Sequence, residues 1–143
     1  VLQENMSLSL RYGNIFSVII IDIDFFKKIN DNFGHQVGDD VLKECSYILS
    51  QNIRNVDTLG RWGGEEFLVV CPETLKDGAK DLAIKLNKAI KLHKFSTYPH
   101  SVTISVGVAS CSVNDLNYDD IISNADKALY EAKNKGRDRV EVF

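Results

Sequence analysis

The sequence predicts an α+β sandwich, in which helices pack against a sheet, for a chain of 143 residues. Two hydrophobic patterns alternate along the chain. Apolar runs and strict alternation indicate strands, and apolar residues three or four apart indicate amphipathic helices. Their order is β-α-β-β-α-β with an added helix and strand, which is the split βαβ or ferredoxin-like arrangement with a central antiparallel strand pair.

The first strand is predicted over residues 16–21, a β-branched run long enough to be buried. It ends in Asp22-Ile23-Asp24, and a carboxylate at the end of a buried strand is costly unless it is paired or bound to a metal. Magnesium binds carboxylate and carbonyl oxygens, so a metal shared with Glu65 would account for Asp22. A helix N-cap is the alternative role for Asp22.

The other elements follow from the same two patterns. In the helix predicted at 36–54, Asp39 and Asp40 are expected in the first turn, where carboxylates favour the helix dipole. Gly136 is expected to end the last helix. Helices are predicted at 1–14, 25–33, 36–54, 74–93 and 118–134, and strands at 58–62, 66–71, 101–110 and 140–143.

The predicted hairpin 58–71 turns at Gly63-Gly64-Glu65-Glu66-Phe67. Adjacent glycines accept positive φ angles at little cost and let a ligand approach the backbone closely. Because side chains alternate along a strand, Glu65 and Glu66 are expected on opposite faces, so that only one faces a given site. A solvated acidic hairpin tip is the alternative to a functional role.

Composition excludes several classes of protein. With 44% hydrophobic and 26% charged residues, the chain fits one globular domain over residues 1–143. Its formal charge of −3 argues against a general binder of nucleic-acid polymers, which carries a basic stripe. Cys45, Cys71 and Cys111 lie in apolar segments without metal-site spacing, typical of reduced core residues in a cytoplasmic protein. No stretch resembles a membrane span or a signal peptide.

Several motifs, in order, resemble the GGDEF domain of diguanylate cyclases in its GGEEF variant, over nearly the whole chain. The family's usual Asp-x-Leu-Thr-Gly-Leu-x-Asn-Arg entry segment is absent. We therefore expect an N-terminally truncated domain from a longer regulated protein, with membrane anchoring of that protein left open. The matching motifs are Asp22-Ile23-Asp24-Phe25-Phe26-Lys27, Asn30-Asp31, Phe33-Gly34-His35, Gly38-Asp39, Arg61-Trp62-Gly63-Gly64-Glu65-Glu66-Phe67, residues 103–109, residues 125–133 and Gly136-Arg137.

The resemblance implies a nucleotidyl-cyclase-like fold that condenses two GTP molecules into cyclic di-GMP and releases pyrophosphate. It implies Mg²⁺ or Mn²⁺, two ions per GTP, held by Asp22, the Ile23 carbonyl and Glu65. Either Glu65 or Glu66 would help to deprotonate the attacking hydroxyl. The implied substrate contacts are Gly63 and Gly64 close to the nucleotide, Phe25, Phe26, Lys27, Lys133 and Arg137 at the phosphates, and Asn30 and Asp39, with His35 nearby, at guanine.

Alternatives stay open for several of these residues. Lys133 and Arg137 lie near a helix C-terminus, where the helix dipole alone favours cations. One domain resembles half of an active site, so the active unit is expected to be a homodimer and the isolated domain mostly monomeric. The alternatives to a cyclase are a catalytically silent domain that binds GTP or cyclic di-GMP as an effector, and a purely structural interaction module.

Arg54-Asn55-Val56-Asp57 is separated by five residues from Gly63. This spacing is similar to that of the family's Arg-x-x-Asp inhibitory site, where cyclic di-GMP binds away from catalysis. A guanidinium offers paired donors to a guanine edge or a phosphate, and Asp57 can accept from guanine N–H groups. The alternative is a helix-ending arginine paired with a turn aspartate.

Overall fold

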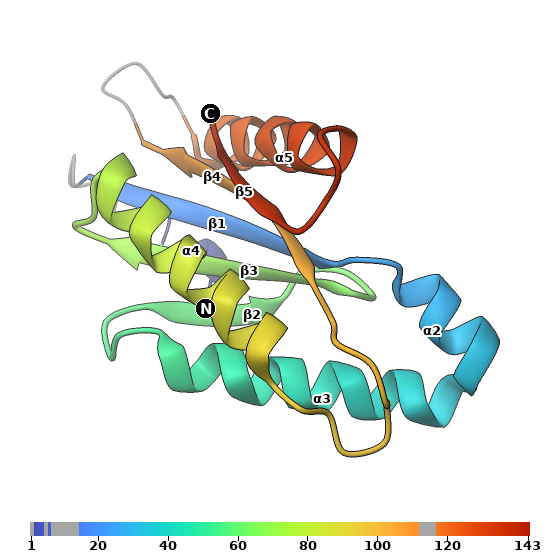
Figure 1. Ribbon diagram of the computed structural model, residues 1–143. Coiled ribbons are helices and arrows are strands. Elements are labelled where there is room, and N and C mark those ends of the chain that lie inside the picture. Colours follow the sequence, from blue (N-terminus) through green and yellow to red (C-terminus); the bar gives the residue numbers. More distant parts are fainter. Residues whose placement is uncertain (1, 5, 7–14, 112–116) are drawn as a thin grey trace.

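The computed structural model describes residues 2–4, 6, 15–111 and 117–143 (Figure 1). A five-stranded sheet has the order β2-β3-β1-β4-β5. This architecture confirms the predicted α+β fold. The elements are β1 (Phe16–Ile23), α2 (Phe26–Phe33), α3 (His35–Asn52), β2 (Thr58–Arg61), β3 (Glu66–Pro72), α4 (Lys76–Leu92), β4 (Ile104–Ser110), α5 (Tyr118–Asn134) and β5 (Arg139–Val142).

Strand β1 is the centre of the sheet. It pairs antiparallel with β3 on one side and with β4 on the other, and β4 pairs parallel with β5. The register places Asp22 of β1 opposite Glu66 of β3. The acidic end of β1 and the β2–β3 turn therefore meet at one edge of the sheet, as predicted. Figure 1 shows α2 beyond this end of β1.

The sheet is covered on both faces, which explains the uninterrupted apolar run of β1. All eight residues of β1 are buried. Ile19, Ile21 and Ile23 belong to the larger core, which α3 and α4 complete. Val18 and Ile20 point the other way and pack with α5. Alternation along β1 thus directs Asp22 toward the α5 face.

The three cysteines belong to these cores, as predicted. Cys45 and Cys71 are buried in the larger one, and burial raises the pKa of each thiol to about 12. Cys111 is partly buried against the α5 core. Within the described ranges, no helix is both long and apolar enough to cross a membrane.

Some local predictions need correction. Helix α3 begins at His35, so Asp39 and Asp40 lie beyond its first turn, and Asp40 accepts a hydrogen bond from Thr97 Oγ1 at 2.9 Å instead. The helix predicted at 74–93 begins only at Lys76, and Leu75 precedes it in an extended conformation and is exposed. Residues 2–4 and 6 are helical, whereas the rest of the predicted helix 1–14 lies outside the described residues.

Candidate functional site

Carboxylates from two distant segments meet where β1 ends. The Asp22 side chain is 7% exposed, and its Oδ2 forms an ion pair with Lys133 Nζ of α5. Asp22 Oδ1 is buried and has no hydrogen-bond partner among the described residues. The Ile23 N–H donates to the Glu65 carbonyl at 3.3 Å, which ties the turn to the end of β1. The structure thus brings Asp22, Glu65, Glu66 and Lys133 together.

Burial and neighbouring charges shift the pKa of both glutamates of this cluster. Burial and then the charge of Asp22 raise the pKa of both Glu65 and Glu66, while Lys133 lowers both. A proton on Glu65 can also be shared with the Asp22 carboxylate, and this hydrogen bond raises the pKa of Glu65 further. Glu66 lies opposite Asp22 in the strand register, and the Glu65 carbonyl accepts from Ile23 next to Asp22. The alternation rule does not apply because β3 begins at Glu66 and Glu65 belongs to the turn.

The Gly63-Gly64 turn is the predicted hairpin, but its glycines do not have positive φ angles. A Cβ atom on Gly64 would meet nothing within 4 Å, so its backbone is open to a ligand. A Cβ on Gly63 would lie 2.9 Å from Glu66 Oε2, which places that carboxylate over the turn. Arg61 closes the turn by donating to the Gly64 carbonyl at 2.6 Å.

The donor set fits a divalent cation. Asp22 Oδ1 is a buried acceptor without a donor, and such an atom is costly unless a cation or a donor satisfies it. No three His, Cys, Asp or Glu side chains of the described residues form a ready-made metal cage. Magnesium does not require one, because it keeps water and substrate oxygens and takes one or two carboxylates from the protein. Asp22 and Glu65 would supply these, beside the Ile23 backbone.

Backbone amides and cationic side chains that could bind a phosphate lie next to the carboxylates. Phe25 has a left-handed backbone, with φ of 58°, and precedes α2, whose N-terminus has no side-chain cap. The amides of its first turn are therefore available to an anion. Lys27 is exposed. Phe26 is buried in the core, so only the backbone of Phe26 can contact a phosphate. The Arg137 guanidinium lies 5.0 Å from the centre of the Phe25 ring.

The residues predicted to read guanine lie on two neighbouring helices. Asn30 is half-buried on α2, and a Cβ atom on Gly38 of α3 would lie 1.7 Å from its Oδ1. Gly38 therefore makes room for Asn30, a role that its place before Asp39 did not reveal. His35 and Asp39 are exposed and four residues apart, on one side of α3.

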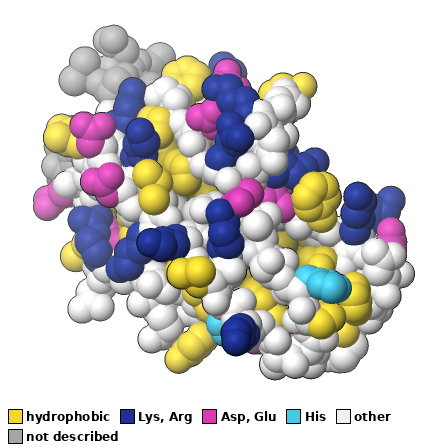
Figure 2. Space-filling model, in the orientation of Figure 1, with side chains coloured by type: hydrophobic (Ala, Val, Ile, Leu, Met, Phe, Trp, Pro, Cys, Tyr) yellow, Lys and Arg dark blue, Asp and Glu magenta, His cyan; other side chains and the backbone are white. Residues whose placement is uncertain are grey.

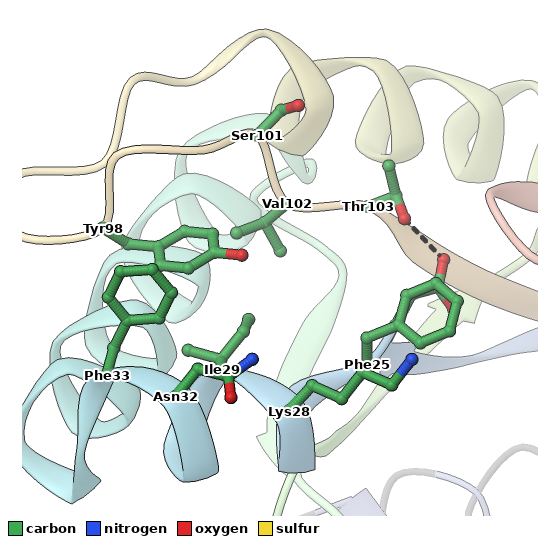
Figure 3. Close-up of a pocket in the computed structure, with 10 residues that line it drawn as sticks. Phe25, Lys28, Ile29, Asn32, Phe33, Tyr98, Ser101, Val102 and Thr103 are labelled. Carbon is green, nitrogen blue, oxygen red and sulfur yellow. Dashed lines mark hydrogen bonds between the residues drawn. The ribbon is translucent and has the colours of Figure 1, made fainter.

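A pocket of about 290 Å³ opens between α2 and the segment that leads into β4. Figure 3 shows Phe25 and Lys28 at one end and Phe33 against Tyr98 at the other. The predicted guanine readers do not line this pocket. Phe25, next to the uncapped start of α2, also lines this pocket. So does the buried Asp24, which accepts a hydrogen bond from Thr103 Oγ1 at 2.7 Å. Asp24 was not among the predicted site residues, although its position in Asp22-Ile23-Asp24 could have indicated a role at the site.

Arg54 and Asp57 lie at the other end of the hairpin from Gly63-Gly64 and bind each other. Arg54 Nη2 donates to Asp57 Oδ1 at 2.7 Å and to Thr74 Oγ1 at 2.6 Å, and Arg54 Nε donates to Asp57 Oδ2 at 3.1 Å. The Asp57 side chain is 0% exposed, whereas that of Arg54 is 51% exposed. Only the arginine can meet a ligand in this arrangement.

Surface charge matches the composition. On the face in Figure 2, lysine and arginine side chains are interspersed with acidic ones and form no continuous basic stripe. The cationic groups that matter for an anionic ligand are therefore local ones, above all Lys133 and Arg137.

Comparisons with known proteins agree with this geometry. The family described as "Diguanylate cyclase, GGDEF domain" matches residues 1–139. Diguanylate cyclase A of Treponema denticola is 44% identical over 128 residues, which are 88% of this chain and 34% of that protein. The chain thus spans about a third of the length of this curated relative.

Two solved structures have the same fold. The active GGEEF domain of a diguanylate cyclase from Vibrio cholerae is 35% identical, with a TM-score of 0.91, and the match covers 99% of this chain and 90% of that one. The GGDEF domain of DgcB from Caulobacter crescentus, solved in complex with c-di-GMP, is 25% identical, with a TM-score of 0.90 over 99% of this chain and 85% of that one. The chain belongs to the GGDEF family of diguanylate cyclase domains.

Proposed function

We propose that residues 1–143 form a diguanylate cyclase domain, which condenses two GTP molecules into cyclic di-GMP and two pyrophosphates. The observation that carries this proposal is the buried Asp22, with one oxygen on Lys133 and the other without a donor, opposite Glu66 and beside Glu65. The names of the relatives support it, since they include a diguanylate cyclase and an active GGEEF domain of one. We propose a cytoplasmic location for the reaction, because GTP would be its substrate.

The chain's own residues divide the work by their chemistry. Asp22 and Glu65, with the Ile23 carbonyl, would hold Mg²⁺ or Mn²⁺, two ions per GTP. When bound, these ions neutralise phosphate charge and acidify the attacking hydroxyl. Lys133 and Arg137 would neutralise phosphate oxygens from the other side, close to the amides at the start of α2 and to Lys27.

The chemical step is an in-line displacement at phosphorus. The 3′-oxygen of one GTP forms a bond to the α-phosphorus of the other, and the bond from that phosphorus to pyrophosphate breaks. The hydroxyl proton passes to a glutamate carboxylate. Glu65 and Glu66 both suit this role, because their raised pKa values make each a stronger base than an ordinary glutamate. Two steps of this kind close the ring.

Guanine selection would come from α2 and α3. The Asp39 carboxylate can accept from the N1–H and the exocyclic amine of guanine, and adenine has no such pair of donors. The Asn30 amide, fixed against Gly38, and the nearby His35 would complete the base site. A site built from hydrogen-bonding groups discriminates strongly against a base that leaves them unpaired.

Each chain provides one GTP site, so two copies must face each other for the condensation. A homodimer with twofold symmetry satisfies this requirement, since it directs each 3′-hydroxyl toward the partner's α-phosphate. The experiment is incubation of the purified domain with GTP and MgCl₂, followed by mass spectrometry. Cyclic di-GMP is the expected product. Nucleotide binding without product would overturn the proposal in favour of a silent effector domain, and absence of both would overturn it outright.

We also propose that cyclic di-GMP inhibits the enzyme by binding at Arg54. The guanidinium is half-exposed and is fixed by Asp57 and Thr74, so it is preorganised for a phosphate or a guanine edge. Asp57 would act through Arg54 and not touch the product, because its carboxylate is fully buried. This differs from the direct guanine contact that the sequence suggested.

The Arg54→Ala variant tests this regulatory site. Loss of a coupled effector site changes apparent affinity roughly 5–150-fold, so the product concentration for half-inhibition should rise by at least tenfold while turnover without product stays unchanged. Lys43→Ala, which removes an exposed cation from the middle of α3, is the control and should inhibit normally. An Arg54→Ala domain as sensitive to product as the parent would remove the assignment.

A further inference from the structure

We infer that Asp24 is a positioning residue, which sets the phosphate-binding direction of Arg137 through the turn between α5 and β5. This inference rests on the proposed function, because it takes Arg137 as a contact for the phosphates of GTP. Asp24 lies directly after β1, two residues beyond Asp22, and it is buried. Its partners come from segments that are distant in the sequence.

The turn that carries Arg137 has an unusual backbone. Helix α5 ends with two bonds, from the Gly136 N–H to the Lys133 carbonyl at 3.4 Å and from the Arg137 N–H to the Ala132 carbonyl at 2.9 Å. These are the bonds of a Schellman motif. Arg137 and Asp138 then both have positive φ angles, of 65° and 47°. Non-glycine residues adopt this conformation at a cost, so the surrounding contacts must hold it.

Asp24 supplies the first of these contacts. Its Oδ2 accepts from the Asp138 backbone N–H at 2.9 Å. It also accepts from Thr103 Oγ1 at 2.7 Å, the bond that the dashed line at Thr103 marks in Figure 3. Its Oδ1 accepts from Ser105 Oγ at 2.6 Å and lies 4.0 Å from Arg137 Nη1. The three hydrogen-bond donors are neutral, so Arg137 is the cation that accompanies this buried charge.

The Asp138 side chain supplies the second contact. Asn87 Nδ2 of α4 donates to Asp138 Oδ1 at 3.2 Å, and Lys91 Nζ pairs with Asp138 Oδ2 at 2.8 Å. Asn87 also donates to the Ile104 carbonyl at 3.1 Å, which ties α4 to the start of β4. The Asp138 backbone thus holds the turn to Asp24, directly after β1, and the Asp138 side chain holds it to α4.

The contacts of Asp24 and Asp138 leave the Arg137 guanidinium available to a ligand. Its side chain is 37% exposed, and no guanidinium N–H donates a hydrogen bond to another described residue. The guanidinium lies over the Phe25 ring, next to the uncapped start of α2. Asp24 therefore attracts one side of the guanidinium and directs its donors toward the start of α2, where the phosphates of GTP would bind. An arginine that is fixed in advance binds a phosphate with less loss of entropy.

The test measures binding of 3′-deoxy-GTP with Mg²⁺ by calorimetry, since this nucleotide lacks the attacking hydroxyl and is not consumed. Asp24→Asn keeps the shape of the side chain but removes its charge, so Kd should rise about tenfold. In an Arg137→Ala background the same change should raise Kd less than about twofold, because its target is gone. NMR should show faster hydrogen exchange of the Asp138 amide and loss of an ordered Arg137 Nε–H signal in Asp24→Asn.

Thr103→Val is the second variant, and it removes a single hydrogen bond to Asp24 at a half-buried position. It should raise Kd about threefold in the parent background alone, and it decides the matter if Asp24→Asn does not fold. Equal effects in both backgrounds, or an unchanged Kd despite a mobile Asp138 amide, would overturn the inference. A parent domain that binds no nucleotide would instead overturn the proposed function, and the inference with it.

Discussion

The two carboxylate oxygens of the buried Asp22 differ in their contacts. One carboxylate oxygen is paired with Lys133, and the other has no donor among the described residues. The sequence predicted that this acid needs a partner, because it ends an apolar strand. It assigned Lys133 to the phosphates of the same site and did not pair it with Asp22. The pair joins residues 111 positions apart, and the contact exists only because α5 packs on the same face of the sheet as Asp22.

The Glu65→Gln variant tests the roles proposed for Glu65 as a metal ligand and as the base. A neutral amide is a poor ligand for Mg²⁺ and cannot accept the hydroxyl proton, so turnover should fall at least a hundredfold. Far-UV circular dichroism should be unchanged. Mg²⁺ should raise the melting temperature of the parent more than that of the variant, because a cation that binds the folded state stabilises it.

Glu131→Gln is the matched control for Glu65→Gln. Glu131 is exposed on α5, and its ion pair with Lys135 is a surface pair of small energetic value. This variant should keep the activity of the parent and its response to Mg²⁺. A folded Glu65→Gln domain that makes cyclic di-GMP at a near-normal rate would exclude Glu65 from both roles.

The pH dependence of stability tests the electrostatics of Glu66. Burial and the charge of Asp22 raise its pKa, so the folded domain holds this proton more tightly than the unfolded chain does. From the ordinary glutamate pKa of about 4.3 upward, the domain therefore loses stability as pH rises, until the carboxyl is ionised in both states. Glu66→Gln removes this loss. Urea unfolding should show the variant more stable than the parent at pH 7, with a smaller difference at pH 4; an equal difference at both would contradict the argument.

Helices and strands were predicted well, but their ends and turns were not. Periodicity follows from burial, and the long amphipathic helix α5 has the bounds predicted from it. The orientation of Glu65 depended on where β3 starts, and a shift of one residue moved it from the strand into the turn. Asp39 and Asp40 similarly depended on the first residue of α3. End positions are set by tertiary contacts, which a local pattern does not contain.

Gly38→Ala tests how α3 supports Asn30 of α2. The new methyl group would lie 1.7 Å from Asn30 Oδ1 and 2.8 Å from its Cγ, so the amide must move. We expect GTP affinity to fall about tenfold and the preference for GTP over ATP to narrow, measured by calorimetry. Gly78→Ala on α4 is the control, because its nearest neighbour would be Thr74 Cγ2 at 3.3 Å. It should leave both affinities unchanged, and a Gly38→Ala domain with parental selectivity would remove Asn30 from the base site.

At the scale of the molecule, the order of elements predicted which distant segments meet. Antiparallel pairing of β1 with β3 followed from the split βαβ order, and it brings Asp22 to the glycine turn. The contacts that hold the α5–β5 turn were beyond prediction. The bond from the Asp138 amide to Asp24 spans 114 positions, and the Asn87 bond to Asp138 spans 51. Such bonds require the packed sheet and α4 together, and no local pattern encodes them.

In the proposed reaction, each chain provides one GTP site and two copies meet to form cyclic di-GMP. The most direct test is the initial rate of cyclic di-GMP formation, measured by mass spectrometry at saturating GTP and Mg²⁺ over a hundredfold range of protein concentration. We expect specific activity to rise with protein concentration while the domain is mostly monomeric, as sedimentation velocity on the same samples should show. Absence of product at every concentration, or a specific activity that stays constant on dilution through a monomeric range, would contradict it.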